Sequence, residues 1–330
     1  MKKIIWLTII SIVAFFLLKG WWSSQLAAVS LDKSSQTFII AKGESLTQIG
    51  NKLKKQNLIR NLWAFVIFGK QSAMSAKIQA GTFKIAASFS VPEIFKVITG
   101  QPVAFWVTLI EGWRAEEMAD ELSLKLKTQS FDPERSLRAQ DKSSMFLKLA
   151  KEGYMFPDTY LFPPDITQEQ IVQKLRETFD QKYKELKPKF ASLGLTQDEA
   201  VILASIVERE ARSEEVKTRV ASILLKRYKI GMGLNADATV QYALGYQQKE
   251  KSWWKRHLSK EDLKIDSAYN TYLHAGLPPT PISNPGLVSL KAVANADPST
   301  PYLYYYHDSK GNSHYAKTLD EHNQNVANNP

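Results

Sequence analysis

Cysteine is absent from all 330 residues of the sequence. This absence excludes disulfide bonds, thiolate metal sites and a cysteine nucleophile. Glycine and proline are also scarce, at 15 and 14 residues, which argues against collagen-like, low-complexity or disordered chains. No internal repeat, Gly-rich phosphate loop, nucleophile elbow or dinucleotide fingerprint is present. We therefore expect a folded chain, and its length predicts about two domains.

Acidic residues are outnumbered. Lys and Arg total 43 against 33 Asp and Glu, which gives a formal charge of +10. Such an excess favours an anionic partner, such as nucleic acid, a phospholipid surface or an acidic polymer.

A hydrophobic segment lies at the N-terminus. Lys2–Lys3 precede the apolar run Ile4–Leu18, and Trp21–Trp22 follow it. A short apolar run with interfacial tryptophans predicts a transmembrane anchor over residues 1–22, with the N-terminus in the cytoplasm. The alternative is a cleaved signal peptide with its cut near residues 26–28. Either topology places the rest of the chain outside the cytoplasm, so we expect membrane lipid and not nucleic acid as a partner.

Three further regions follow the anchor. Residues 23–36 read as a polar linker, residues 37–102 as a small α/β module, and residues 103–330 as a larger α+β region. A strand, the segment Lys42–Ile49 and a helix follow one another in the module, and this order resembles a lysin-motif module, a fold that binds peptidoglycan sugars. The same pattern also describes an ordinary capped helix.

Six short motifs follow one another along the chain. They are Glu111–Trp113, Gly153–Tyr160, Ala204–Glu210, Ala268–Tyr272, Gly276–Pro279 and Leu319–Asn323. In that order and spacing they resemble the endolytic murein transglycosylases, membrane-anchored cell-wall lyases of bacteria.

The resemblance implies a function. An α+β catalytic domain in the periplasm, held at the inner membrane, would cleave the β-1,4 bond between N-acetylmuramic acid and N-acetylglucosamine in nascent glycan strands. Cleavage would leave 1,6-anhydro-muramyl ends and limit strand length. The resemblance implies no cofactor, and it names glycan strands and cell-wall synthesis enzymes as partners.

One helix provides a candidate acid. Thr196 and Glu199 have the spacing of a capping box, and residues 200–207 are nonpolar except for one serine, which predicts a buried helix. Glu208 follows directly, and burial beside apolar groups would raise its pKa. The resemblance assigns Glu208 as the catalytic glutamate. The structural alternative is an ion pair between Glu208 and Arg212.

A second carboxylate is harder to place. Glu210 lies about 200° around the helix from Glu208, so we expect the two not to face one sugar. Asp237 is a better geometric candidate, although an Asp before a helix often caps it. A transglycosylase needs only one glutamate, whereas a hydrolytic muramidase needs a second carboxylate.

Polar and aromatic residues predict a sugar-binding groove, because tyrosine faces stack on sugars and amides and hydroxyls pair with N-acetyl groups. The candidate substrate-binding residues are Ser205, Asp237, Tyr242, Asn270, Thr271 and Tyr272. The five histidines show no ligand spacing, so no metal site is expected. The alternative from another class is a non-catalytic scaffold that binds peptidoglycan.

Overall fold

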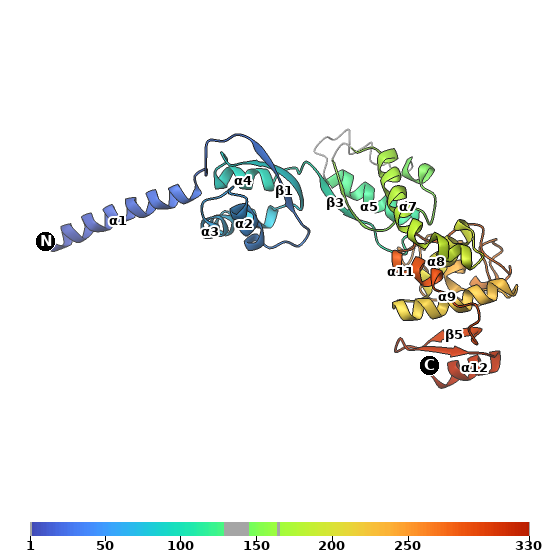
Figure 1. Cartoon of the computed structure of the whole chain (residues 1–330). Helices are drawn as coiled ribbons and strands as arrows, with labels where there is room; N and C mark the ends of the chain where they lie inside the picture. The colour runs from blue at the N-terminus through green and yellow to red at the C-terminus, as the bar shows by residue number, and fades with distance from the viewer. Residues whose placement is uncertain (1, 129–144, 164–165, 330) are drawn as a thin grey trace. The chain divides into compact units, whose positions relative to one another are not determined.

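The chain has a mixed α+β fold, as its sequence predicts (Figure 1). The computed structural model describes residues 2–128, 145–163 and 166–329. Two compact units divide the chain: the first is Met1–Val107 with Tyr160–Ile166, and the second is Thr108–Thr159 with Thr167–Pro330.

The first unit contains a two-stranded antiparallel sheet covered by short helices. Phe38 and Phe83 lie opposite each other in this sheet and are fully buried in the core. The Ser45 hydroxyl accepts from the Gln48 amide while the Gln48 side chain accepts from the Ser45 amide, which closes a capping box at the start of a helix. The elements are α1 (Lys2–Leu26), β1 (Ser35–Ile40), α2 (Leu46–Lys55), α3 (Leu62–Gln71), the 3-10 helix η1 (Met74–Lys77), β2 (Gly81–Ala86), α4 (Val91–Ile98), β3 (Phe105–Thr108) and β4 (Thr159–Phe162).

The N-terminal segment departs from the predicted boundary. Helix α1 continues past Trp22 to Leu26. Beyond it, the amides of Val29 and Ser30 both donate to the Ala87 carbonyl, so part of the predicted linker is ordered against the module.

No single helix within the described residues combines the length and the apolar character needed to cross a bilayer. Helices α7 (Gln168–Ser192) and α8 (Gln197–Glu210) of the second unit meet that criterion only as a pair, with a bend of 103° between them.

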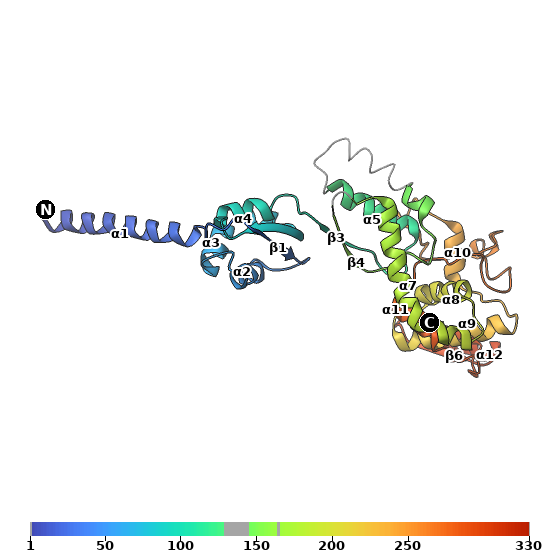
Figure 2. The ribbon, with the colours of Figure 1, turned by 45° about the horizontal axis from the view of Figure 1, so that its top comes forward.

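The second unit is built around helix α8. All eight residues from Ala200 to Val207 are buried, and α11 packs against α7, α8 and α9 (Figure 2). Strand β5 of a C-terminal hairpin lies beside α9, and α12 packs on the two strands of this hairpin. The elements are α5 (Ala115–Thr128), α7 (Gln168–Ser192), α8 (Gln197–Glu210), α9 (Glu214–Lys229), α10 (Asp237–Leu244), the 3-10 helix η2 (Asp262–Lys264), α11 (Leu287–Ala294), β5 (Tyr304–His307), β6 (Ser313–Ala316) and α12 (Leu319–Asn328).

A buried asparagine joins motifs that are far apart in sequence. The Asn284 side chain donates to Glu152 at 2.7 Å and to the Trp113 carbonyl at 3.1 Å, and it accepts from the Met155 amide at 2.9 Å. The backbone of Asn284 also bonds with Gly112 and Trp113. These bonds fix the segment after Gly276 against residues 112–113 and 152–155.

Candidate active site

Glu208 lies at the last turn of α8 in a closed polar cluster. One carboxylate oxygen is 2.6 Å from the Lys217 ammonium nitrogen, and both side chains are about 5% exposed, at 6% and 5%. The other oxygen accepts from the Gly286 amide at 2.9 Å and from the Ser289 hydroxyl at 2.7 Å. Both carboxylate oxygens of Glu208 are therefore occupied by donors of the chain. Its ion-pair partner is Lys217 on α9, not Arg212.

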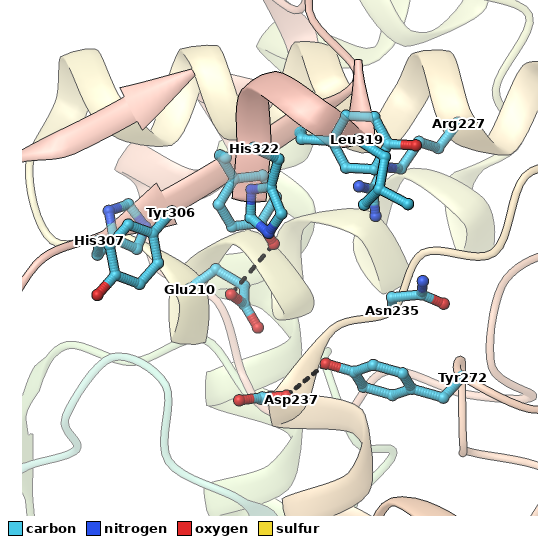
Figure 3. A pocket seen from close by; sticks show the side chains of 11 residues that line it. Glu210, Arg227, Asn235, Asp237, Tyr272, Tyr306, His307, Leu319 and His322 are labelled. Carbon is cyan, nitrogen blue, oxygen red and sulfur yellow. Dashed lines mark hydrogen bonds between the residues drawn. The ribbon is translucent and has the colours of Figure 1, made fainter. Parts of the chain in front are cut away.

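Glu210, in contrast, faces a cavity. Its carboxylate accepts from the Tyr305 hydroxyl at 3.1 Å and from the Ala238 amide at 3.4 Å (Figure 3). The cavity has a volume of about 450 Å³. We call it the tyrosine cavity; its lining consists of Glu210, Arg227, Asn235, Asp237, Tyr272, Tyr304, Tyr305, Tyr306, His307, Leu319 and His322.

The environment of Glu210 makes its carboxyl a weak acid. Burial raises its pKa, and the nearby negative charge of Asp237 raises it further, to about 7. Burial also raises the pKa of Tyr305, so this phenol stays protonated and donates to Glu210. A carboxyl with a pKa near neutrality can both give and take a proton, which suits general acid–base chemistry.

Asp237 and Tyr272 lie next to Glu210. Figure 3 shows the three side chains converging, and the Tyr272 hydroxyl donates to the Asp237 carboxylate at 2.6 Å. Asp237 is the first residue of α10, but Ala236 occupies the N-cap position and makes no side-chain cap bond. The side chain of Asp237 therefore binds Tyr272 and faces the cavity, and it does not cap the helix.

A second cavity meets the first at Glu210. It has a volume of about 770 Å³ and shares Glu210 and His307 with the tyrosine cavity. We call it the cationic cavity; its lining consists of Glu208, Arg209, Glu210, Ala211, Arg212, Ser213, Val216, His307, Asp308, Ser309, Lys310, Gly311 and Ser313. Glu210 therefore lines both the tyrosine cavity and the cationic cavity.

Comparison with known proteins identifies the family. A model of the YceG-like family matches residues 38–328. The chain belongs to the YceG-like family. Its sequence is 32% identical over 316 residues to the endolytic murein transglycosylase of Bacillus subtilis (strain 168), covering 89% of this chain and 85% of that protein. The family resemblance predicted from the motifs is confirmed.

The chain is also similar to proteins of lower sequence identity. The endolytic murein transglycosylase of Streptococcus pneumoniae serotype 2 is 25% identical over 333 residues, and the match covers 90% of this chain but 59% of that protein. A crystal structure of a YceG-like protein from Listeria monocytogenes is 28% identical, with a TM-score of 0.58. That match covers 88% of this chain and 99% of the Listeria chain.

Not all of the predicted substrate-binding residues reach the cavities of this YceG-like protein. Asp237 and Tyr272 line the tyrosine cavity. Ser205 is fully buried, and its hydroxyl accepts from the Ile282 amide and donates to the Ile202 carbonyl. Tyr242 packs on the Arg114 guanidinium, 4.0 Å from the ring centre. Ser205 is therefore a structural contact, and Tyr242 lies outside the lining of both cavities.

Asn270 and Thr271 are buried as well. The Asn270 amide donates to the Leu263 and Ile265 carbonyls at 3.0 and 2.9 Å. The Thr271 hydroxyl accepts from the Ala236 amide at 3.0 Å. Asn270 is 0% and Thr271 2% exposed, so neither can touch a ligand, and both hold the loops around α10.

The hairpin residues that line the tyrosine cavity were not among the substrate-binding residues predicted from the sequence. Tyr304, Tyr305 and Tyr306 are consecutive in β5, followed by His307. The run of consecutive aromatic residues was the feature of the sequence that could have identified this part of the cavity. His322, which also lines the cavity, follows in α12. Within the described ranges, no group of three or more His, Asp or Glu side chains is arranged to hold a metal ion.

Glu210→Gln is expected to stabilise the fold at alkaline pH. The pKa of the carboxyl rises from its ordinary value of 4.5 to about 7 in the folded chain, so the folded state binds more protons between these values. The contribution of Glu210 to wild-type stability is therefore fully present below pH 4.5 and is lost as pH rises through 7. At pH 8 the variant should have a free energy of unfolding roughly 3 kcal/mol higher than the wild type.

Urea unfolding at pH 4.5 and pH 8 measures this difference. The stability gained by Glu210→Gln should fall toward zero at the lower pH. The exposed control Glu185→Gln should show no such dependence of stability on pH. A Glu210→Gln variant with equal stability to wild type at pH 8 would mean that Glu210 ionises at its ordinary pKa.

Proposed function

We propose that this protein is an endolytic murein transglycosylase in which Glu210 is the catalytic acid and base. The observation that carries the proposal is a half-buried carboxyl, with its pKa raised to about 7, in a cavity lined by aromatic rings. Relatives named endolytic murein transglycosylase supply the reaction. The bond cleaved is the β-1,4 link between N-acetylmuramic acid and N-acetylglucosamine in nascent strands, and its cleavage limits strand length.

The reaction uses Glu210 twice. The protonated carboxyl gives its proton to the glycosidic oxygen as the bond to the anomeric carbon breaks. The resulting carboxylate then takes the proton of the 6-hydroxyl, whose oxygen attacks the anomeric carbon of the same sugar. This closes a 1,6-anhydro ring without consuming water and returns Glu210 to its protonated state. The Tyr305 hydroxyl, 3.1 Å away, stabilises the carboxylate between the two steps.

The tyrosine cavity suits a sugar ring. Aromatic faces with polar tips stack on sugars, and Tyr304 and Tyr306 supply them. Arg227 is fixed by bonds from its Nε to the Leu303 carbonyl at 2.6 Å and from its Nη1 to the Leu234 carbonyl at 2.7 Å. We propose that its guanidinium edge in the cavity meets an acyl oxygen of the substrate.

Glu208 fits a supporting role better than the catalytic role expected from the sequence. Its side chain is 6% exposed, and its described contacts are all with donors of the protein itself. We propose that the Glu208–Lys217 pair ties α8 to α9 and so holds Glu210, two residues on, in position.

One observation favours a second candidate function, a hydrolytic muramidase. Asp237 lines the same cavity as Glu210, and two carboxylates across one sugar can activate water. Reducing ends in the product would favour this reaction. Digestion of uncrosslinked glycan strands by the purified protein tests both, and the absence of any new chain ends would instead indicate a scaffold.

We also propose that α1 anchors the protein in the inner membrane, with its N-terminus in the cytoplasm and the second unit in the periplasm. The apolar side chains of its C-terminal half are exposed, among them Phe15, Phe16 and Leu17 at 61%, 64% and 69%. Exposed apolar surface on one helix is what a bilayer would cover.

Retention of this helix is a testable consequence. The natively expressed protein is expected to keep residues 1–22 and to require detergent for extraction from the inner membrane fraction. Intact mass spectrometry measures where the mature chain starts. A start near Val29 would replace the anchor with a cleaved signal peptide.

We further propose that the module at residues 37–102 binds glycan. A cavity of about 300 Å³ lies at the turn between β1 and α2, where Lys42, Gly43 and Glu44 line it together with Ser75. This is the segment that resembles a lysin motif.

Filling the module cavity should weaken binding. Ser75→Trp is expected to reduce pull-down of the protein on purified sacculi several-fold, because the indole would occupy the space a sugar needs. Ser72→Trp, at an exposed position outside the lining, is the matched control. Equal pull-down of both variants on sacculi would indicate that the module is a spacer and does not bind glycan.

A further inference from the structure

The two cavities that meet at Glu210 have different chemistry. The tyrosine cavity is lined mainly by rings, whereas the cationic cavity carries Arg209, Arg212 and Lys310 and a single aromatic side chain, His307. We infer that the cationic cavity binds the acidic peptide carried by N-acetylmuramic acid, through Arg212 and Lys310. This inference rests on the proposed transglycosylase function.

The two cations come from different elements and face one space. Arg212 lies in the connection between α8 and α9, and Lys310 lies in the turn between β5 and β6. Both residues are exposed, and neither makes an ion pair within the part of the chain that the structure describes. An incoming carboxylate would therefore have two cations available without displacing a protein partner.

The acidic groups of the cationic cavity are already engaged. Glu208 pairs with Lys217 at 2.6 Å, and Glu210 accepts from Tyr305. Asp308 accepts from the Lys310 amide at 2.9 Å and from the Asn312 amide at 2.8 Å.

The Asp308 carboxylate also faces the His314 ring, 3.1 Å from Nε2. His307, the other titratable group of the lining, contacts the Ser313 hydroxyl through Nδ1 at 2.9 Å. With its carboxylates held by these donors, the cavity presents Arg212 and Lys310 to a ligand.

The position of the cavity also fits a peptide. The peptide is attached to the muramic acid ring whose anomeric carbon is attacked, so it must leave the sugar close to Glu210. A space of about 770 Å³ beside Glu210 is large enough for a short peptide. Ala211 and Val216 add apolar wall for the methyl groups of alanine residues, and Gly311, with φ of 85°, has open space where a side chain would stand.

Kinetics on two substrates test the inference. The first substrate is uncrosslinked glycan with its peptides intact, and the second is the same glycan after an amidase has removed the peptides, leaving only the lactyl carboxylates. The double variant Arg212→Gln/Lys310→Gln should raise KM for the first substrate roughly five- to tenfold and should change kcat little, since two solvated charge pairs are lost. For the second substrate KM should change less than about twofold. Lys187→Gln, an exposed cation on α7, is the control and should leave both constants unchanged.

A third substrate and added salt sharpen the test. Amidating the peptide carboxylates should raise the wild-type KM to that of the double variant, and high salt should reduce the difference between the two proteins. Equal KM changes on glycan with and without peptide would overturn the peptide site and indicate binding of the lactyl carboxylate. No KM change on either substrate, with normal wild-type turnover, would overturn it outright. Absence of wild-type turnover on both substrates would instead contradict the proposed function.

Discussion

Glu210→Gln is expected to lower the rate of glycan cleavage by about 10²- to 10⁴-fold while leaving the fold intact, because general acid–base catalysis contributes about that much. Glutamine keeps the volume of the side chain and a carbonyl to accept from Tyr305, but it has no proton to give to the glycosidic oxygen. Single-turnover digestion of uncrosslinked glycan strands measures the rate. Circular dichroism and urea unfolding of the same sample check the fold.

The control for this prediction is the neighbouring carboxylate. Glu208→Gln alone would leave Lys217 buried without its partner, so the matched variant is Glu208→Gln/Lys217→Met, which removes both charges. We expect this double variant to keep activity within about tenfold of wild type, since in the proposed mechanism Glu210 transfers the proton and Glu208 holds α8 in position. Full activity in Glu210→Gln together with loss in the double variant would return the catalytic role to Glu208.

Lys217→Met is expected to lower the free energy of unfolding by about 3–5 kcal/mol, the typical result of breaking a buried ion pair from one side. The Lys217 nitrogen lies 2.6 Å from Glu208, and neither side chain is more than 6% exposed. Removal of the ammonium leaves a carboxylate in a closed cluster with only the Gly286 amide and the Ser289 hydroxyl.

Chemical denaturation measures the effect of Lys217→Met, with the exposed substitution Lys187→Met as control. The Glu208→Gln/Lys217→Met double variant should recover part of the loss, because no unpaired charge remains. A midpoint for Lys217→Met equal to that of the control would show that the pair carries no stabilising energy.

Local patterns in the sequence predicted much of the fold. The spacing of Thr196 and Glu199 predicted the start of α8, and the structure has both bonds of the capping box. The order of a strand, the segment Lys42–Ile49 and a helix in the module was also predicted correctly, as β1 and α2. These features depend on neighbours a few residues away, which the sequence displays directly.

The choice between Glu208 and Glu210 depends on contacts that the sequence does not display. Helix α8 is apolar all round, so its pattern marks no solvent face and does not tell which carboxylate faces a cleft. The two carboxylates differ in their partners: Lys217 and Ser289 bind Glu208, while Tyr305, 95 residues away in sequence, reaches Glu210. The two carboxylates have different partners, as the helix geometry predicted, and of the two only Glu210 lines the tyrosine cavity.

The prediction of polar substrate-binding residues also depended on contacts that the sequence does not display. Asn270 and Thr271 have the composition of a sugar-binding site, yet their polar groups are used by backbone amides and carbonyls around α10. A buried polar side chain must find a partner, and a short irregular loop offers many. Sequence alone does not separate a side chain that holds a loop from one that binds a ligand.

The mass of the product ends tests the central claim most directly. Uncrosslinked glycan strands digested by the wild-type protein should yield muropeptides with 1,6-anhydro-muramyl ends, each lighter by one water than a reducing end, and Glu210→Gln should yield almost none. Reducing ends from the wild type would contradict the account, because they require water as the nucleophile and a second carboxylate, for which Asp237 in the same cavity is the first candidate.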